Sequence, residues 1–424
     1  MHQKMNKIIV FVILIIKISL VLTQKEITLF VASVPKYYTP LNEDIFLTGT
    51  LNNWNLKNEN YKLTRLTHNT FTTKLSLAYG NYEYKFSRGS AETVETAFDG
   101  TPKIRTFSVN ENLKVDKIDV NIENWSDMIG NHSASGNVMI LHTKFPFPTL
   151  NTTKKILIYL PPDYYTSNKR YPVFYVHDGH AAFDVFLNSF NGDVGYDEMM
   201  ENFHLKSKQT SILVGIPQIT NKERTEQLTP FPNYNFPTGT DSPGGKGDLY
   251  LESIVSHLKP FIDENFRTKP HRNYTGIIGY SLGGLISFYA GIKHQKTFSK
   301  IGAFSATYLW NDTIYSFANN SPVLFDDTKF YCIVGLNENA TFEGVLYDMI
   351  TTMNKMVKIL RSVGYKNVFA KVYKDGEHDD WFWSREFPRA FTYFFLNESS
   401  SSTTILYFNY WKLLILILNL RRFL

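Results

Sequence analysis

The chain has 424 residues, of which 43% are hydrophobic and 20% are charged. These proportions are ordinary for globular proteins, so they exclude disordered and fibrous classes, and the length is enough for two domains. The net charge of +5 is small for such a chain and no long basic run lies in its central part, so we expect no nucleic-acid partner.

The first 23 residues have the features of a secretory signal peptide. Lys4 and Lys7 precede a nearly unbroken apolar run over residues 8–22, and small residues follow it. We therefore expect a chain of the secretory pathway, extracellular or held at the cell surface, with an uncleaved anchor as the alternative. Eight Asn-x-Ser/Thr motifs, which are acceptors for N-glycosylation, agree with secretion and begin at Asn124, Asn131, Asn151, Asn273, Asn311, Asn319, Asn339 and Asn397.

Residues 27–115 alternate short β-rich runs with breaks that contain Asn and Gly, and they show no helical period of useful length. This pattern predicts an all-β, immunoglobulin-like antiparallel sandwich module. Residues 116–135 are polar and rich in Asn, which predicts a linker. The β-rich runs of the module lie at 44–49, 70–77, 82–86 and 103–109.

From residue 136 to residue 396 the pattern changes to continuous apolar strands that alternate with helical stretches. Uninterrupted apolar runs are typical of buried parallel strands, so we expect a doubly wound, mostly parallel α/β sheet. Pro260 should kink the helix expected over residues 251–262. The predicted strands lie at 156–160, 173–176, 212–216, 277–278, 301–304, 331–334 and 368–372.

Residues 397–424 form a polar spacer and a hydrophobic tail. The run 405–420 is mostly apolar and Arg421 and Arg422 follow it. A polar spacer before an apolar tail is typical of a GPI-attachment signal, whereas terminal arginines favour a transmembrane stop-transfer segment. The run is also short for a span of about 20 residues. We expect membrane attachment through this tail, and the sequence leaves its kind open.

The central motif is Gly-Tyr-Ser-Leu-Gly-Gly at residues 279–284. It follows the predicted strand that ends at Ile278 and opens an apolar helical segment over 285–292. Strand, sharp turn and helix are the context of the nucleophile elbow of α/β-hydrolases, in which glycines avoid collisions in a strained turn. The sequence therefore predicts an α/β-hydrolase with Ser281 as the nucleophile.

A serine hydroxyl needs a base, and in this fold the order along the chain is serine, acid, histidine. His378 lies in the loop between the last predicted strand and the final helix, which is where the base should be. The acid should follow the strand that ends near Gly335. Our choice is Glu338, with Glu343 and Asp348 as alternatives.

Two backbone amides are expected to form the oxyanion hole, namely those of Leu282 and of His180, which lies in the loop after the third strand of the fold. No metal or cofactor is expected, because the sequence has no paired cysteines, no His-Glu-x-x-His motif and no Walker loop.

Residues 138–396 resemble the putative-esterase family, which includes feruloyl and other carbohydrate esterases, enterochelin esterases, S-formylglutathione hydrolase and mycobacterial mycolyltransferases. The resemblance implies Ser281 as nucleophile, His378 as base and an acid near residues 334–338. It also places Arg224 near the site, where an internal ion pair is as good an expectation as a substrate contact. The matching motifs are Arg170-Tyr171-Pro172-Val173, His177-Asp178-Gly179, Val214-Gly215-Ile216, residues 224–230, residues 258–263, the elbow and Gly376-Glu377-His378-Asp379-Asp380-Trp381, where the family commonly has glycine in place of Glu377.

The N-terminal module resembles starch- or glycogen-binding modules. The turn Leu47-Thr48-Gly49-Thr50-Leu51-Asn52-Asn53-Trp54 and the strand Tyr82-Glu83-Tyr84-Lys85-Phe86 carry this resemblance. It implies that Trp54 stacks on a sugar ring, although related modules often have a second Trp where this chain has Ala91. A scaffold role for Trp54 is the alternative.

Taken together, these patterns predict a serine carboxylic-ester hydrolase that forms an acyl-enzyme on a small-molecule or glycan ester, such as an acylated carbohydrate. One alternative is an acyltransferase that uses the same three residues. The other is a non-catalytic surface protein that binds polysaccharide through its N-terminal module.

Overall fold

The computed structural model describes residues 24–35, 39–110, 117–187, 193–236, 240–338, 340–342 and 345–395. The predicted signal peptide and the predicted C-terminal tail lie outside these residues. The chain divides into two compact units. The first comprises Met1–Pro162, Gly179–Asp193 and Val214–Pro217, and the second comprises Asp163–Asp178, Val194–Leu213 and Gln218–Leu424.

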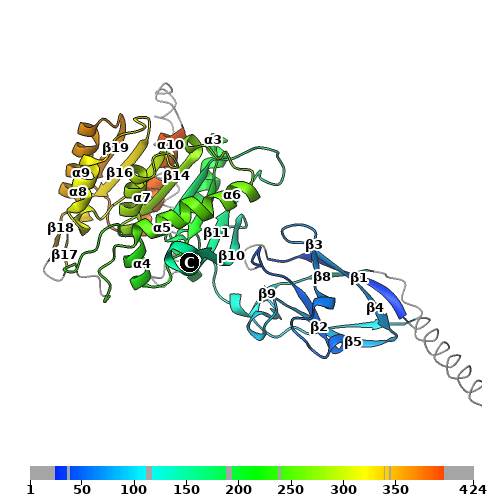
Figure 1. Ribbon diagram of the computed structural model, residues 1–424. Coiled ribbons are helices and arrows are strands. Elements are labelled where there is room, and N and C mark those ends of the chain that lie inside the picture. Colours follow the sequence, from blue (N-terminus) through cyan, green and yellow to red (C-terminus); the bar gives the residue numbers. More distant parts are fainter. Residues whose placement is uncertain are drawn as a thin grey trace, which may run out of the picture. The chain divides into compact units, whose positions relative to one another are not determined.

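Short strands dominate the N-terminal region, as the alternating sequence predicts (Figure 1). Two sheets have the strand orders β3-β4-β1-β8 and β2-β5-β7, and β6 pairs with β9. Most of these pairs are antiparallel, but β1 and β8 run parallel. The immunoglobulin-like sandwich stays a prediction. The strands are β1 Gln24–Ser33, β2 Phe46–Gly49, β3 Thr64–Arg65, β4 Phe71–Ala78, β5 Gly80–Ser87, β6 Glu95–Thr96, β7 Arg105–Val109, β8 Lys117–Asn121 and β9 Asn124–Trp125.

The predicted linker over residues 116–135 differs from the structure, because β8 and β9 lie within it and pair with β1 and β6. Trp125 is fully buried, its indole N–H donates to Thr39 Oγ1 at 2.9 Å, and the Arg88 guanidinium lies 5.2 Å from its ring centroid. A buried tryptophan contributes a large hydrophobic area, so this segment is part of the N-terminal fold. The polar composition that suggested a linker belongs to edge strands and turns.

Eight strands form one mixed sheet in the order β10-β11-β13-β12-β14-β15-β16-β19. β10 and β11 are antiparallel, whereas β12, β14, β15, β16 and β19 run parallel to their neighbours. This is the predicted α/β-hydrolase fold with its mostly parallel sheet. The bounds are β10 Val138–Phe147, β11 Thr152–Tyr159, β12 Val173–His177, β13 Ile212–Ile216, β14 Thr275–Tyr280, β15 Lys300–Phe304, β16 Lys329–Gly335 and β19 Asn367–Tyr373, with a separate β17 Ala340–Phe342 and β18 Val345–Tyr347 hairpin.

Helices cover both faces of the parallel part of the sheet. Successive residues of β16 show this, because side chains alternate between faces along a strand. Phe330 packs against Phe288 of α7, whereas Tyr331 packs against Tyr393 and Phe394 of α10. The helices are α2 Gly179–Phe183, α3 Tyr196–Ser207, α4 Asn221–Gln227, α5 Gly247–Ser253, α6 Lys259–Asn265, α7 Leu282–Lys293, α8 Thr313–Asn320, α9 Met349–Val363 and α10 Asp380–Phe395.

Pro260 does disturb its helix, although not by ending it. A π-helical turn over Ile254–Leu258 joins α5 to α6, and Pro260 occupies the first turn of α6. Because proline has no N–H and its ring crowds the carbonyl four residues earlier, the preceding backbone widens by one residue.

No helix among the described residues has the length and apolarity that crossing a membrane requires.

Candidate active site

A sharp turn between β14 and α7 presents Ser281. Its φ of 55° and ψ of −122° lie in a region that non-glycine residues rarely adopt. Such strain costs on the order of 1–3 kcal/mol and persists only where neighbouring structure holds it. The chain approaches itself closely here, since a Cβ atom on Gly279 would lie 2.6 Å from the carbonyl carbon of Gly283. The predicted strand, turn and helix are therefore present, with glycine where no side chain fits.

Backbone hydrogen bonds hold the turn from two sides. The Ser281 N–H donates to Phe304 O at 3.0 Å, and the Ser281 carbonyl accepts from Leu285 at 3.0 Å and from Thr307 at 3.2 Å. The partly exposed Ser281 Oγ lies 3.4 Å from Thr307 Oγ1. Because Ser281 precedes the first turn of α7, the helix dipole and its free N–H groups favour negative charge at this hydroxyl.

Glu338 and His378 form a hydrogen-bonded pair, with His378 Nδ1 at 2.9 Å from Glu338 Oε2. The other oxygen, Oε1, accepts from the Gly335 N–H at 2.6 Å and from Ser305 Oγ at 2.7 Å. The side chain of Glu338 is fully buried, whereas that of His378 is 39% exposed. A carboxylate can only accept here, so Nδ1 carries the proton and Nε2 is left as a proton acceptor.

The chain brings these residues to the same edge of the sheet. Ser281 directly follows β14, Glu338 lies three residues after β16, and His378 lies five residues after β19. Because these strands are parallel, their carboxyl ends meet at one edge, which is where α/β folds bind ligands.

No direct hydrogen bond joins Ser281 to His378 among the described residues, and the Trp383 indole lies against His378 and against Tyr280, the residue before Ser281. Among the described residues, Ser281 Oγ bonds to Thr307 and the His378 ring bonds to Glu338. Trp383 stacks on Tyr280 with ring centroids 4.1 Å apart and planes at 9°, and it meets the His378 ring edge-on at 5.0 Å. The indole therefore contacts both the base and the residue before the nucleophile.

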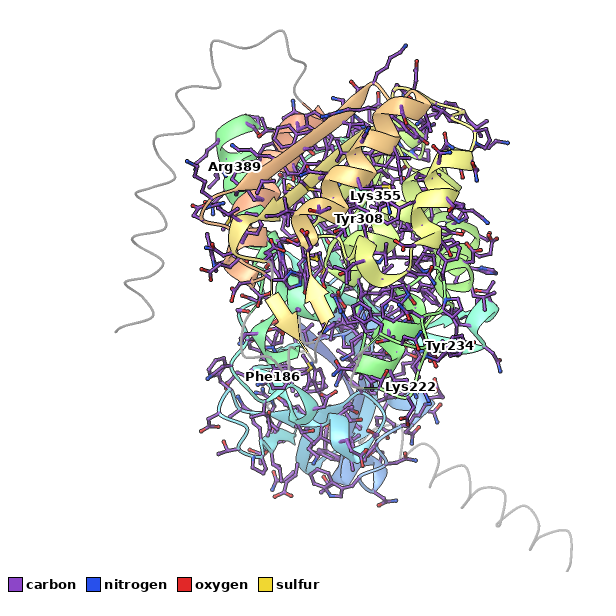
Figure 2. The ribbon with its side chains drawn as sticks, turned by 90° about the vertical axis from the view of Figure 1, so that its left-hand side faces the viewer. Phe186, Lys222, Tyr234, Tyr308, Lys355 and Arg389 are labelled. Carbon is purple, nitrogen blue, oxygen red and sulfur yellow. The ribbon has the colours of Figure 1, made fainter. Side chains whose placement is uncertain are left out.

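An arginine of α10 braces the loop that carries His378. Arg385 Nη1 donates to Asp375 Oδ2 at 2.5 Å, and Arg385 Nε donates to Glu386 Oε1 at 2.8 Å. Arg389, labelled in Figure 2, donates to the same buried carboxylate of Glu386. Two cations and a buried carboxylate thus fix the start of the loop to the final helix, and the charge of Arg385, through its hydrogen bond, lowers the pKa of Asp375.

Arg224 forms an ion pair, one of the two roles left open for it. Its Nε and Nη2 donate to the two oxygens of Asp178, each at 2.9 Å. Burial alone would lower the pKa of Arg224, but the charge and hydrogen bonds of Asp178 outweigh it and raise this pKa. Asp178 itself has a φ of 52°, and a Cβ atom on Gly283 would lie 3.4 Å from its Oδ2. The pair therefore lies beside the first turn of α7, and a substrate contact of Arg224 stays a prediction.

The proposed oxyanion donors lie at the starts of helices. Leu282 is the first residue of α7, and His180 is the second residue of α2. Their joint role stays a prediction.

Glu343 and Asp348 were the alternatives to Glu338 as the catalytic acid. Glu343 lies outside the described residues. Asp348 caps α9, because its Oδ1 accepts from the Thr351 N–H at 2.9 Å. Glu338 is the acid that the structure brings to His378.

Trp54 lies in a turn where Asn53 and Trp54 itself both have positive φ values, 55° and 58°. Asn52 holds the turn, since its side chain accepts from the Gly49 N–H at 3.0 Å and donates to Leu47 O at 3.0 Å. The indole is partly exposed, with the Lys85 ammonium 5.9 Å from the ring centroid. One face of the ring is thus approached by a cation, and sugar stacking by Trp54 stays a prediction.

Three residues near the site were not anticipated, namely Ser305, Thr307 and Trp383. Ser305 directly follows β15 and Thr307 comes two residues later, so their position at the carboxyl end of a parallel strand was a usable signal. Trp383 lies in the first turn of α10, five residues after His378, which precedes the helix, so no sequence spacing marked their contact. No group of three or more His, Cys, Asp or Glu side chains that could hold a metal occurs in the described part of the chain.

The mixed eight-stranded sheet, with helices on both faces of its parallel part, defines an α/β-hydrolase fold. The chain belongs to the family described as "Putative esterase", whose model matches residues 148–394. The uncharacterized protein YbbA of Bacillus subtilis (strain 168) is 25% identical over 251 residues, which are 58% of this chain and 95% of YbbA.

The chain is also similar to part of one further protein sequence and to one solved structure. An α-amylase of Niallia circulans is 33% identical over 105 residues, which are 24% of this chain but only 8% of the amylase. The crystal structure of the BES protein from Bacillus cereus is 18% identical, covers 63% of this chain and 98% of its own, and has a TM-score of 0.50. At this identity the likeness to BES shows the fold alone.

Proposed function

We propose that this esterase-family chain is a serine carboxylic-ester hydrolase that works through an acyl-enzyme. The observation that carries the proposal is the pairing of His378 with the buried Glu338 at the sheet edge where the strained turn presents Ser281. Membership of the family supports ester hydrolysis, and the pairing supports the serine mechanism.

In the proposed mechanism Ser281 Oγ attacks the ester carbonyl while His378 Nε2 takes its proton. Glu338 keeps the proton of His378 on Nδ1 and stabilises the imidazolium that forms. The amides of Leu282 and His180 would bind the oxyanion, and the imidazolium returns its proton to the leaving alcohol. Water then repeats the sequence on the acyl-enzyme and releases the acid.

The missing hydrogen bond between Ser281 and His378 is compatible with this proposal. Catalytic hydrogen bonds in ligand-free structures are often long and tighten only when substrate binds. The His378 side chain is 39% exposed, so its ring has room to turn. A small rotation of the Ser281 hydroxyl away from Thr307 would free it for the base.

The direct test is labelling of the purified full chain with a fluorophosphonate probe, followed by mapping of the modified peptide. Label on Ser281, and its loss in Ser281→Ala, is the expected result. Label on another serine, or equal labelling of the variant, would remove the proposal. Hydrolysis assayed with and without a polyol separates the hydrolase from the acyltransferase alternative, which would form a new ester with the polyol.

Sugar binding by the N-terminal module is a second candidate function. The partly exposed side chain of Trp54 supports it. Affinity electrophoresis in gels that contain starch tests it: retardation that Trp54→Ala abolishes is expected, and equal mobility with and without starch would reject it.

We also propose that the protein acts in the secretory pathway or at the cell surface. The charged and apolar pattern of residues 1–23, the glycosylation motifs and the apolar tail support this. Asn124 is only 3% exposed, so we expect its motif to stay unmodified in the folded protein. Glycosidase treatment of the secreted chain, with a shift in mass, tests the proposal.

A further inference from the structure

Ser305 is a strained residue whose hydroxyl reaches the proposed catalytic acid. Its φ is 44°, a left-handed conformation that glycine adopts without strain, and the residue is 1% exposed. The Ser305 Oγ donates to Glu338 Oε1 at 2.7 Å, while the Ser305 N–H donates to Ile333 O at 2.8 Å. The strained backbone thus aims a buried hydroxyl at the carboxylate that pairs with His378.

Trp383 supplies the hydrogen bond that orients this hydroxyl. The indole N–H of Trp383 donates to Ser305 Oγ at 2.9 Å, so the hydroxyl proton of Ser305 is directed to Glu338. The same indole stacks on Tyr280 and meets the ring edge of His378. One side chain therefore touches the neighbour of the nucleophile, the partner of the acid and the base.

Glu338 depends on these contacts for its orientation. A carboxylate can rotate about its last bond, and Oε2 points at His378 only while Oε1 is held elsewhere. Two donors hold Oε1, the Gly335 N–H of the same chain segment and the Ser305 hydroxyl from the neighbouring strand end. Hydrogen bonds to an ionised carboxylate are stronger than those between neutral groups, so the loss of one matters.

We propose that Ser305 and Trp383 are positioning residues for the reaction, which hold Glu338, and through it His378, in the orientation that proton transfer requires. This inference rests on the proposed function, because it presumes that His378 is the base. Neither residue touches the reacting atoms. Their effect should therefore appear in kcat and leave KM nearly unchanged.

The first test compares Ser305→Gly and Ser305→Ala with the parent on an aryl acetate. Both remove the hydroxyl, but only the glycine variant also removes the backbone strain. We expect kcat to fall about tenfold to a hundredfold in both, with KM within about twofold. If the hydroxyl were dispensable, both variants would keep the parent kcat, and that result would overturn the proposal.

A double-mutant comparison separates positioning from a general structural effect. If Ser305 acts through Glu338, Ser305→Gly should cost nothing further in a Glu338→Ala background. An equal fall in kcat in both backgrounds would show that Ser305 acts elsewhere, against the proposal. The proposed function fails on a different result, namely full activity of Ser281→Ala.

Trp383→Phe tests the indole N–H while an aromatic ring remains. The matched control is Trp381→Phe, two residues earlier on α10, whose side chain is 36% exposed and has the Arg385 guanidinium 5.0 Å from its ring centroid. We expect a fall in kcat of about threefold to tenfold for Trp383→Phe only. A proton NMR spectrum should show the low-field Nδ1–H signal of His378 shifted or broadened in Ser305→Gly and in Trp383→Phe. An unchanged signal in both variants would overturn the proposal.

Discussion

His378 Nδ1 lies 2.9 Å from Glu338 Oε2, and the carboxylate is fully buried while the imidazole reaches solvent. The acid therefore sets the tautomer of the base from inside the protein. Glu338→Gln keeps the size of the side chain but replaces the charged acceptor, and it can present an N–H to Nδ1. We expect kcat on an aryl acetate to fall by about three to four orders of magnitude, less than in Ser281→Ala.

The control for that variant is Glu377→Gln, which removes a carboxylate from an exposed position directly before His378. It should leave kcat within about twofold of the parent. If Glu338→Gln were as active as Glu377→Gln, the acid would have to be sought elsewhere, with Glu343 and Asp348 as the candidates.

The elbow allows a test of stability as well as of activity. A methyl group on Gly279 would lie 2.6 Å from the backbone of Gly283, whereas one on Gly136 would meet nothing within 4 Å. Gly279→Ala should lower the free energy of unfolding by about 1–3 kcal/mol, because backbone must move to admit the atom. Gly136→Ala should change it by less than about 0.5 kcal/mol. Urea denaturation of both variants measures these changes. Equal unfolding midpoints for Gly279→Ala and Gly136→Ala would contradict the packing of the elbow.

The fold was predictable because its strands are apolar and continuous. Each predicted strand of the α/β region overlaps a strand of the sheet. The elbow glycines lie where an added Cβ would meet backbone, that of Gly283 for Gly279 and that of Phe304 for Gly284. Glu338 could be chosen from position alone, since the side chain after a parallel strand must lie at the carboxyl edge. Position in the sequence could not separate Glu338 from Glu343 or Asp348. The structure separates Asp348 from Glu338, because it places Asp348 as the cap of a helix.

The parts that sequence could not supply depend on contacts between distant segments. Ser305 and Trp383 are 78 residues apart, and no local pattern marks their hydrogen bond. The predicted linker over 116–135 failed for a similar reason, since short strands pair with distant partners and Trp125 finds its burial only there. Local composition was polar, and tertiary pairing overrode it.

Arg224 is expected to act through Asp178 and not through the substrate. Arg224→Lys keeps the charge but cannot make two parallel bonds to one carboxylate. Since Asp178 lies against the first turn of α7, we expect kcat to fall about tenfold with KM within about twofold. A rise in KM at constant kcat would instead assign Arg224 to the substrate. Steady-state kinetics on an uncharged and an anionic aryl ester distinguish the two outcomes.

Lys300 should make stability depend on pH in the alkaline range. The side chain is 8% exposed, and this burial lowers its pKa from 10.5 to about 8. The charges of Lys329 and Arg272 also lower the pKa, whereas the charge of Asp327 raises it. In the unfolded chain the group stays protonated up to its ordinary pKa, so between about pH 8 and 10.5 the unfolded state binds more protons and stability rises with pH. Below pH 8 the folded state carries the full cost of the buried charge, on the order of 3 kcal/mol. Lys300→Met removes this cost, so the variant should gain most over the parent at pH 7 and lose that advantage by pH 10.5. Urea denaturation of both proteins at the two pH values measures the difference, and the same advantage at both would mean that Lys300 does not titrate in this window.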